Sequence, residues 1–205
     1  MRKRPAFEEL VFVTSNPNKV KEVQAAITAA GLDISVEQRN MGYTEPQVDT
    51  LEGVVAFGLA DIRARLRGGR VSVPVMVEDS GLFIDRLNGF PGVFSAYVFR
   101  TIGCEGVLRL MGRVPRAQRG SAFKSVIGLL IPGKDAPMHF RGECRGAISL
   151  DIAGTGGFGY DPIFVPREGN RVGRTFAEMT RDEKNAVSHR GRSVEALVAF
   201  LGRGL

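Results

Sequence analysis

The sequence predicts an α/β fold, because apolar runs rich in Val, Ile and Phe alternate with stretches of helical periodicity. Two alternating segments on either side of Pro132-Gly133 are typical of a long hairpin. The chain has 205 residues, with no repeat and no linker, which is enough for one domain with a sizeable core. We therefore predict a single domain over residues 1–205, organised as one body or as two lobes that flank a cleft.

The first part of the chain contains three expected strands and two expected helices. The first helix ends at Gly31, a residue suited to a C-terminal cap, and the second stops at Gly68-Gly69. The third strand is expected to end just before Glu78, ahead of a Ser-Gly turn. The expected strands cover residues 10–14, 34–36 and 73–77, and the expected helices cover residues 18–30 and 50–67.

The second part of the chain combines a hairpin with helices and a glycine-rich loop. Hydrophobic alternation predicts the hairpin strands, and Pro132-Gly133-Lys134-Asp135 predicts their turn. The expected elements are a short helix at 103–111, hairpin strands at 121–131 and 138–150, a glycine-rich loop at 154–159, a short strand at 163–165 and a terminal helix at 181–201.

Composition narrows the class of protein. No apolar stretch is long enough to span a bilayer and no signal core follows the basic start, so we expect a cytoplasmic protein without a membrane partner. Cys104 and Cys144 lie far apart, which suggests neither a zinc site nor a disulfide framework. The net charge of +6 and pI of about 9.7 fit a nucleic acid, a phosphorylated small molecule or merely a basic surface.

Two adjacent acids, Glu78 and Asp79, follow the third expected strand. Ligands gather at the carboxyl ends of strands in open α/β sheets. Neighbouring carboxylates repel each other unless a cation or a proton lies between them. The sequence therefore predicts metal binding or acid/base chemistry here, although solvated acids at a turn are the alternative.

The segment after the first strand predicts an anion site. It places polar groups and Lys19 at the start of a helix, where backbone N–H groups and the helix dipole favour negative charge. The alternative is that Asn16 or Asn18 simply caps the helix. The segment consists of Thr14, Ser15, Asn16, Pro17, Asn18 and Lys19.

Two later segments also have features of a ligand site. The glycine-rich loop contains Phe158 and Tyr160, which offer a stacking face for a base or else plug the core. His189 and Arg190 follow Lys184 near the expected terminal helix, where they bind a phosphate or carbonyl or else form a solvated helix face.

Taken together and in their order along the chain, these candidate segments resemble those of the inosine triphosphate pyrophosphatase family, the Ham1-like nucleotide hydrolases. The resemblance rests on Thr14 to Lys19, on Glu78-Asp79-Ser80-Gly81 with Gly89-Phe90-Pro91-Gly92, on Gly154 to Pro162, and on Thr175-Phe176-Ala177-Glu178-Met179 with Ser188-His189-Arg190. It covers nearly the whole chain. It implies an elongated mixed β-sheet with flanking helices, two lobes around a central substrate cleft, and a homodimer.

The resemblance also implies a role for each matching residue. Residues Thr14 to Lys19 and Lys184 would hold the triphosphate, Asp79 would be the general base and a metal ligand, and Ser80 would touch the substrate. Phe158 would stack on the purine within a contact run of Phe158, Gly159, Tyr160 and Asp161, while His189 and Arg190 would read the base. Mg²⁺ would be held by Asp79 and by Glu45, for which Glu52 is the alternative.

The chain departs from the family pattern in two places. Gly53 and Gly58 stand where many members carry an acid and a Lys, and Phe94 and Tyr97 stand where a Tyr and an Arg are often found.

The expected reaction is Mg²⁺-dependent hydrolysis of ITP, dITP and XTP to the monophosphate and pyrophosphate, without a nucleic-acid partner. The alternatives are a broad-specificity nucleoside triphosphate pyrophosphatase and, from a different class, a basic nucleic-acid-binding protein.

Overall fold

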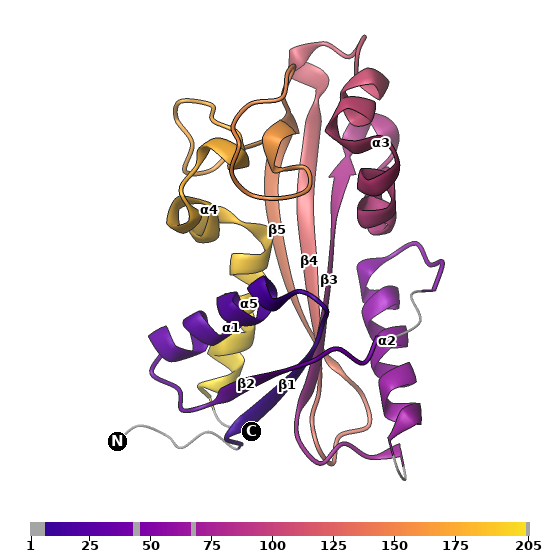
Figure 1. Cartoon of the computed structure of the whole chain (residues 1–205), viewed down its shortest axis with the longest axis vertical. Coiled ribbons are helices and arrows are strands. Elements are labelled where there is room, and N and C mark those ends of the chain that lie inside the picture. The colour runs from indigo at the N-terminus through magenta and orange to yellow at the C-terminus, as the bar shows by residue number, and fades with distance from the viewer. Residues whose placement is uncertain (1–6, 43–45, 67–68, 204–205) are drawn as a thin grey trace. The chain divides into compact units, whose positions relative to one another are not determined.

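A computed structural model describes residues 7–42, 46–66 and 69–203 of the chain (Figure 1). Its six strands form one mixed sheet in the order β2-β1-β3-β4-β5-β6. β1 pairs in parallel with β2 and β3, and β6 pairs antiparallel with β5. The prediction of an α/β fold with a mixed sheet is confirmed. The strands are β1 (Glu9–Val13), β2 (Ser35–Arg39), β3 (Val75–Ile84), β4 (Gly120–Leu130), β5 (Met138–Ile148) and β6 (Phe164–Pro166), and the helices are α1 (Pro17–Ala29), α2 (Leu51–Arg65), α3 (Ser95–Leu110), α4 (Arg181–Val187) and α5 (His189–Leu201).

The chain divides into two compact units, each built from several segments. The first unit comprises Met1–Asp79, Val126–Arg141 and Ser193–Leu205, and the second comprises Ser80–Ser125 and Gly142–Arg192. Each unit has a hydrophobic core of its own. No helix within the described ranges is long and apolar enough to cross a lipid bilayer.

In the first unit, helices cover both faces of the sheet. Leu10 and Phe12 of β1 share a core with α1 and α5. Gly128 of β4 faces α2 instead, because a Cβ at this position would lie 2.3 Å from Cγ1 of Val55. Neighbouring residues of a strand point to opposite faces, so α1 and α5 cover one face and α2 covers the other, as Figure 1 shows for β1 and its neighbours.

The core of the second unit is aromatic, and the guanidinium of Arg119 is buried beside it. The rings of Phe123 and Phe164 lie 4.7 Å apart, and Phe176 packs against both. Arg119 is only 2% exposed, and its guanidinium donates to four backbone carbonyls. These carbonyls belong to Met111, Val114, Ile148 and Ser149, with N···O distances between 2.6 and 3.3 Å. Arg119 therefore ties the chain after α3 to the end of β5 without an acidic partner among these contacts.

The predicted end of the third strand was wrong. β3 does not stop before Glu78 but continues through Ser80 and Gly81 to Ile84. Gly81 allows a close approach rather than a turn, because a Cβ there would lie 2.2 Å from the carbonyl oxygen of Gly92. The next residue, Leu82, donates its N–H to Oγ of Ser95 at 2.8 Å, which fixes the strand against the start of α3.

Two predicted helices also had wrong boundaries. α3 begins at Ser95 rather than at residue 103, and Gly103 interrupts it with φ 61° and ψ −164°, so only the part after the kink was recognised. The predicted terminal helix is two helices, since Ser188 is extended (φ −71°, ψ 153°). The Ser188 hydroxyl accepts the N–H of Gly191 at 3.0 Å and thereby helps to start α5.

The remaining predicted elements are confirmed, with shifts at their ends. β1, α1, α2, the hairpin of β4 and β5, and β6 lie where the sequence predicts them, and β2 extends further than residues 34–36. Gly133 in the hairpin turn has φ 77°, a conformation that glycine adopts without strain.

The buried thiol of Cys144 gives a first testable prediction. Burial raises the pKa of Cys144 from its ordinary value of 9.0 to about 11. The thiol therefore ionises first in the unfolded chain, and the free energy of unfolding falls as the pH rises from 9 to 11. Between pH 8 and pH 10 this amounts to about 1 kcal/mol. Urea unfolding at both pH values is expected to show a correspondingly smaller decline for Cys144→Ala than for the unsubstituted protein, and an equal decline would contradict the assignment.

Candidate active site

The loop between β1 and α1 forms a capped helix N-terminus. Oδ1 of Asn16 accepts the N–H of Asn18 at 2.9 Å, and Oγ1 of Thr14 accepts the N–H of Asn16 at 3.1 Å. Pro17 occupies the first turn of α1, where its missing N–H carries no penalty. Of the two residues that the sequence offers as a cap, Asn16 caps this helix. The same arrangement leaves the positive end of the α1 dipole beside the polar segment of residues 14–16.

Lys19 forms an ion pair with a buried carboxylate. Its Nζ lies 2.5 Å from Oε2 of Glu78 and 3.4 Å from the Glu78 carbonyl oxygen. The side chain of Glu78 is 1% exposed, whereas that of Lys19 is 18% exposed. Met76 belongs to the core under α1 and α5, and residues two apart on a strand share a face, so Glu78 points toward α1. The cation that Glu78 requires is thus an ammonium group of this chain.

Asp79 has different surroundings from Glu78. Because side chains alternate along a strand, Asp79 points to the face that Val75 and Val77 share, away from the side of Lys19. It is partly exposed, in contrast to Glu78. The parallel pairing of β1 with β3 involves Val75 and Met76 and goes no further along β3, so both acids lie just beyond the paired stretch.

The predicted metal ligands are only partly placed. Glu45 lies outside the described residues. In residues 7–42, 46–66 and 69–203, no group of three or more His, Cys, Asp or Glu side chains gathers in a way that could hold a metal ion. Mg²⁺ is commonly bound by one or two carboxylates together with substrate phosphates, and Asp79 offers one carboxylate of this kind.

Glu52, the alternative to Glu45, already has a cationic partner. Nε of Arg141 donates to Oε1 of Glu52 at 2.6 Å. Burial opposes ionisation of Glu52, but the hydrogen bond from Arg141 and one from the backbone hold its pKa below the usual value. The structure therefore gives Glu52 a place in a surface ion pair between α2 and β5.

In the second unit, Phe158 presents an exposed ring next to two cations. The residue is 54% exposed. Nζ of Lys184 lies 4.5 Å from the centre of the ring, and Cζ of Arg190 lies 5.7 Å from it. Both cations lie over the ring, and an exposed aromatic ring that contacts cations is suited to binding a base whose phosphates are close by.

Asp161 holds this loop in place. Its side chain is 4% exposed, and Oδ2 accepts the N–H of Phe158 at 2.8 Å and contacts Nζ of Lys184 at 2.5 Å. Gly157 has φ 72°, and a Cβ there would lie 2.1 Å from Oδ2 of Asp161. The carboxylate of Asp161 therefore organises the Phe158 loop from within.

The neighbouring Tyr160 fills the core, which is the alternative to stacking on a base that the sequence left open. It is 3% exposed, its hydroxyl donates to the Ser95 carbonyl at 3.1 Å, and its ring meets Phe99 edge-on at 5.3 Å. Burial raises its pKa. The side chain of Tyr160 is thus part of the core, while the Gly159 carbonyl accepts a hydrogen bond from Cys104 at 3.5 Å.

His189 and Arg190 are buried at the start of α5. Each is 6% exposed, so the alternative of a solvated helix face is wrong. The His189 ring stacks on Phe123 with a centroid distance of 4.7 Å and an interplanar angle of 11°. Nη2 of Arg190 donates to Oγ of Ser80 at 3.3 Å.

The structure thus assembles the predicted residues into two groups, one in each unit. Thr14 to Lys19 lie with Glu78 in the first unit, whereas the second unit brings Ser80 to Arg190 and Phe158 to Lys184. Phe123, the stacking partner of His189, was not recognised as a site residue. Its only signal in the sequence is its place in an alternating strand, which reveals burial but not the identity of the ring that packs against it.

A double-mutant cycle tests the pairing of Lys19 with Glu78. Lys19→Met leaves a buried carboxylate without this cation and is expected to lower the free energy of unfolding by about 3 kcal/mol. Adding Glu78→Gln should recover part of the loss, with a coupling energy of about 1–3 kcal/mol in urea unfolding. The exposed pair of Glu105 and Arg109, 3.5 Å apart, is the control and should couple by about 0.3 kcal/mol. Equal coupling for both pairs would refute a special role for the buried pair.

Known proteins resemble this chain over almost its whole length. The model of the Ham1 family matches residues 10–200. The chain is 49% identical to a dITP/XTP pyrophosphatase of Pyrococcus horikoshii over 94% of this chain and 96% of that protein, and 45% identical to a dITP/XTP pyrophosphatase of Thermococcus kodakarensis over 96% and 98%. A solved structure of a HAM1 protein from Coxiella burnetii superposes with a TM-score of 0.79 at 29% identity, covering 97% of this chain and all of that one. The chain belongs to the Ham1 family.

Proposed function

We propose that the chain is a nucleoside triphosphate pyrophosphatase that hydrolyses dITP, ITP and XTP to the monophosphate and pyrophosphate. The names of the relatives support a hydrolase that acts on phosphoric anhydrides. The observation that carries the proposal is the exposed ring of Phe158 with Lys184 and Arg190 over it, since an aromatic ring suits a base and the cations suit a phosphate.

Residues at the start of α1 and two lysines bind the triphosphate in this proposal. The N-terminus of α1 favours negative charge, and Lys19 and Lys184 add full positive charges. Each lysine is held by a carboxylate, Glu78 for Lys19 and Asp161 for Lys184. These carboxylates fix the ammonium groups before the substrate arrives, which reduces the side-chain entropy lost on binding.

The second unit selects the base. Phe158 stacks on the purine, and Arg190 donates to the 6-oxo group of hypoxanthine or xanthine. Adenine carries a 6-amino donor at that position, which would face the Arg190 donor without an acceptor. An unpaired buried polar group is costly, so this mismatch disfavours ATP. Ser80 accepts from Arg190 and positions its guanidinium, while the stack on Phe123 orients His189.

Asp79 acts as the general base in the proposed reaction. It takes a proton from a water molecule whose oxygen attacks the α-phosphorus, while the bond between this phosphorus and the bridging oxygen of pyrophosphate breaks. Asp79 and Glu45 are the residues proposed to hold Mg²⁺. The ion would offset the negative charge that builds up on the leaving pyrophosphate.

The protein is further proposed to act in the cytoplasm as a homodimer. The family resemblance supports the homodimer, and light scattering on the purified protein tests the oligomeric state.

A substrate panel tests the function. Pyrophosphate release is measured from dITP, XTP, GTP and ATP, each with Mg²⁺ and with EDTA. We expect Mg²⁺-dependent release from dITP and XTP that exceeds the release from ATP and GTP. Equal rates on all four substrates would favour a broad-specificity pyrophosphatase. Salt-sensitive duplex binding without any pyrophosphate release would favour a nucleic-acid-binding protein.

Asp79→Asn tests the proposed base. The amide keeps the size of the side chain but cannot accept the proton, so kcat on dITP is expected to fall by about two to four orders of magnitude. The control is Asp135→Asn in the β4–β5 turn, where the carboxylate is fully exposed and pairs with Arg63 at 3.4 Å. This variant should retain its activity. Near-normal turnover by Asp79→Asn would remove Asp79 from the catalytic step.

A further inference from the structure

The loop that follows β6 gathers arginines around a hollow that the proposed reaction does not use. The hollow has a volume of about 570 Å³. Pockets for small ligands commonly have volumes of about 300–1,000 Å³. Its lining consists of Arg167, Gly169, Asn170, Arg171, Val172 and Arg174. All of these residues belong to the second unit, and none of them is among the residues proposed to bind or hydrolyse the nucleotide.

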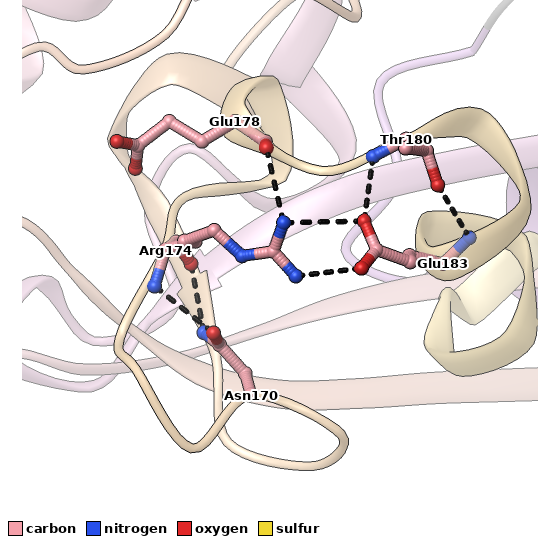
Figure 2. A network of polar contacts seen from close by, with 5 residues as sticks. All are labelled: Asn170, Arg174, Glu178, Thr180 and Glu183. Atoms are coloured by element: carbon pink, nitrogen blue, oxygen red, sulfur yellow. Dashed lines mark hydrogen bonds and ion pairs between the residues drawn. The ribbon is translucent and has the colours of Figure 1, made fainter.

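Hydrogen bonds give this loop a fixed shape. Nδ2 of Asn170 donates to the carbonyls of Pro166 at 3.0 Å and Arg174 at 2.7 Å, and Oδ1 accepts the N–H of Arg174 at 2.9 Å. Figure 2 shows how Asn170 reaches the backbone of Arg174. One amide side chain therefore ties the two ends of the loop together, which preorganises the hollow between them.

Arg174 is anchored at the base of this loop. Its guanidinium forms two bonds to Glu183, at 2.7 and 3.2 Å, and Glu183 in turn accepts the N–H of Thr180 at 2.8 Å (Figure 2). The bond from Arg174 and the backbone bond lower the pKa of Glu183 to about 2, so this pair stays charged at neutral pH. Nε of Arg174 is buried and finds no acceptor among the described residues.

The remaining charges leave the hollow positive. Glu168, the acid within the loop, forms an ion pair with Arg192. The side chains of Arg167 and Arg171 are exposed and make no hydrogen bond or ion pair within the described part of the chain. Two guanidinium groups are therefore available to a ligand, and the neighbouring acids are already neutralised.

We propose that this loop is an accessory binding site for the phosphate group of a small phosphorylated molecule. Planar guanidinium groups match phosphate oxygens with paired N–H donors. Val172, which is 77% exposed in the lining, offers an apolar contact for a nucleoside attached to that phosphate. A single hollow suits a compact anion, whereas a nucleic acid would require a stripe of cations that follows its backbone.

An NMR titration without turnover tests the site. The ¹⁵N-labelled full chain is titrated in EDTA at low salt with inorganic phosphate, pyrophosphate and inosine monophosphate. We expect saturable shifts of the amides of residues 167–174 that weaken as salt is added. Shifts with all three probes show recognition of the phosphate itself, and a shift of Val172 only with the nucleotide shows that the nucleoside is recognised too.

Two double variants test which arginines bind the phosphate. Arg167→Gln with Arg171→Gln is expected to weaken the affinity at residues 167–174 about tenfold or more, since two charge-assisted hydrogen-bond donors are lost. Arg113→Gln with Arg116→Gln is the matched control, because these exposed arginines of the same unit do not line the hollow. The control variant should bind like the unsubstituted protein.

Two results would overturn the proposal: no saturable shift at residues 167–174 with any of the three probes, or equal weakening in both double variants. The titration requires no hydrolysis. A failure of dITP cleavage therefore leaves this test intact, and a failure of this test leaves the proposed function intact.

Discussion

A carboxylate buried within strand β3 constrains the whole first unit. Glu78 is almost completely removed from water, and an isolated charge in that position would be strongly destabilising. Lys19 compensates it, and Lys19 reaches Glu78 only because α1 begins directly after β1 and packs across the face that carries Met76. The position of α1 in turn sets where its positive N-terminus and the capping residue Asn16 lie. One ion pair thus links the core of the first unit to the surface proposed to bind phosphate.

Alternation along β3 separates the functions of adjacent residues. A turn after Asp79, as the sequence suggests, would have left both acids in one loop with similar exposure. An uninterrupted strand instead buries Glu78 against α1 and directs Asp79 to the other face. This arrangement explains how two neighbouring acids avoid competing for one proton or one cation. Glu78, which is paired with a lysine, has a positioning role, whereas Asp79 lies on the other face and is partly exposed.

Local sequence predicted the elements that depend on local interactions and missed the boundaries set by distant contacts. β1, α1 and the β4–β5 hairpin follow from periodicity, a cap and a turn, which a short window contains. Gly81 looked like part of a turn, but its role depends on the carbonyl of Gly92. Ser188 looked helical, but its extended backbone starts a new helix in which Gly191 lies against the carbonyl of Asn185. No short window contains both members of such a contact.

The candidate site shows the same limit at the level of single side chains. Phe158 and Tyr160 stand two residues apart in one glycine-rich loop, and the sequence treats them alike. Tyr160 turns inward to bond the Ser95 carbonyl, while Phe158 remains exposed beside Lys184 and Arg190. Asp161 accounts for the exposure of Phe158. Its buried carboxylate accepts the Phe158 N–H and pairs with Lys184, and this leaves the Phe158 ring outside the core.

The net positive charge of the chain has meaning only through its distribution. The Arg119 guanidinium is hydrogen-bonded to four backbone carbonyls, and that of Arg174 is paired with Glu183. Neither therefore contributes a free charge at the surface. Arg167 and Arg171 keep exposed charges, because Glu168, the acid in their loop, is already paired with Arg192. Overall charge could therefore suggest a nucleic acid and a phosphorylated small molecule equally well. A preference between them arises only when the unpaired guanidinium groups are found around one open surface hollow rather than along a continuous stripe of cations.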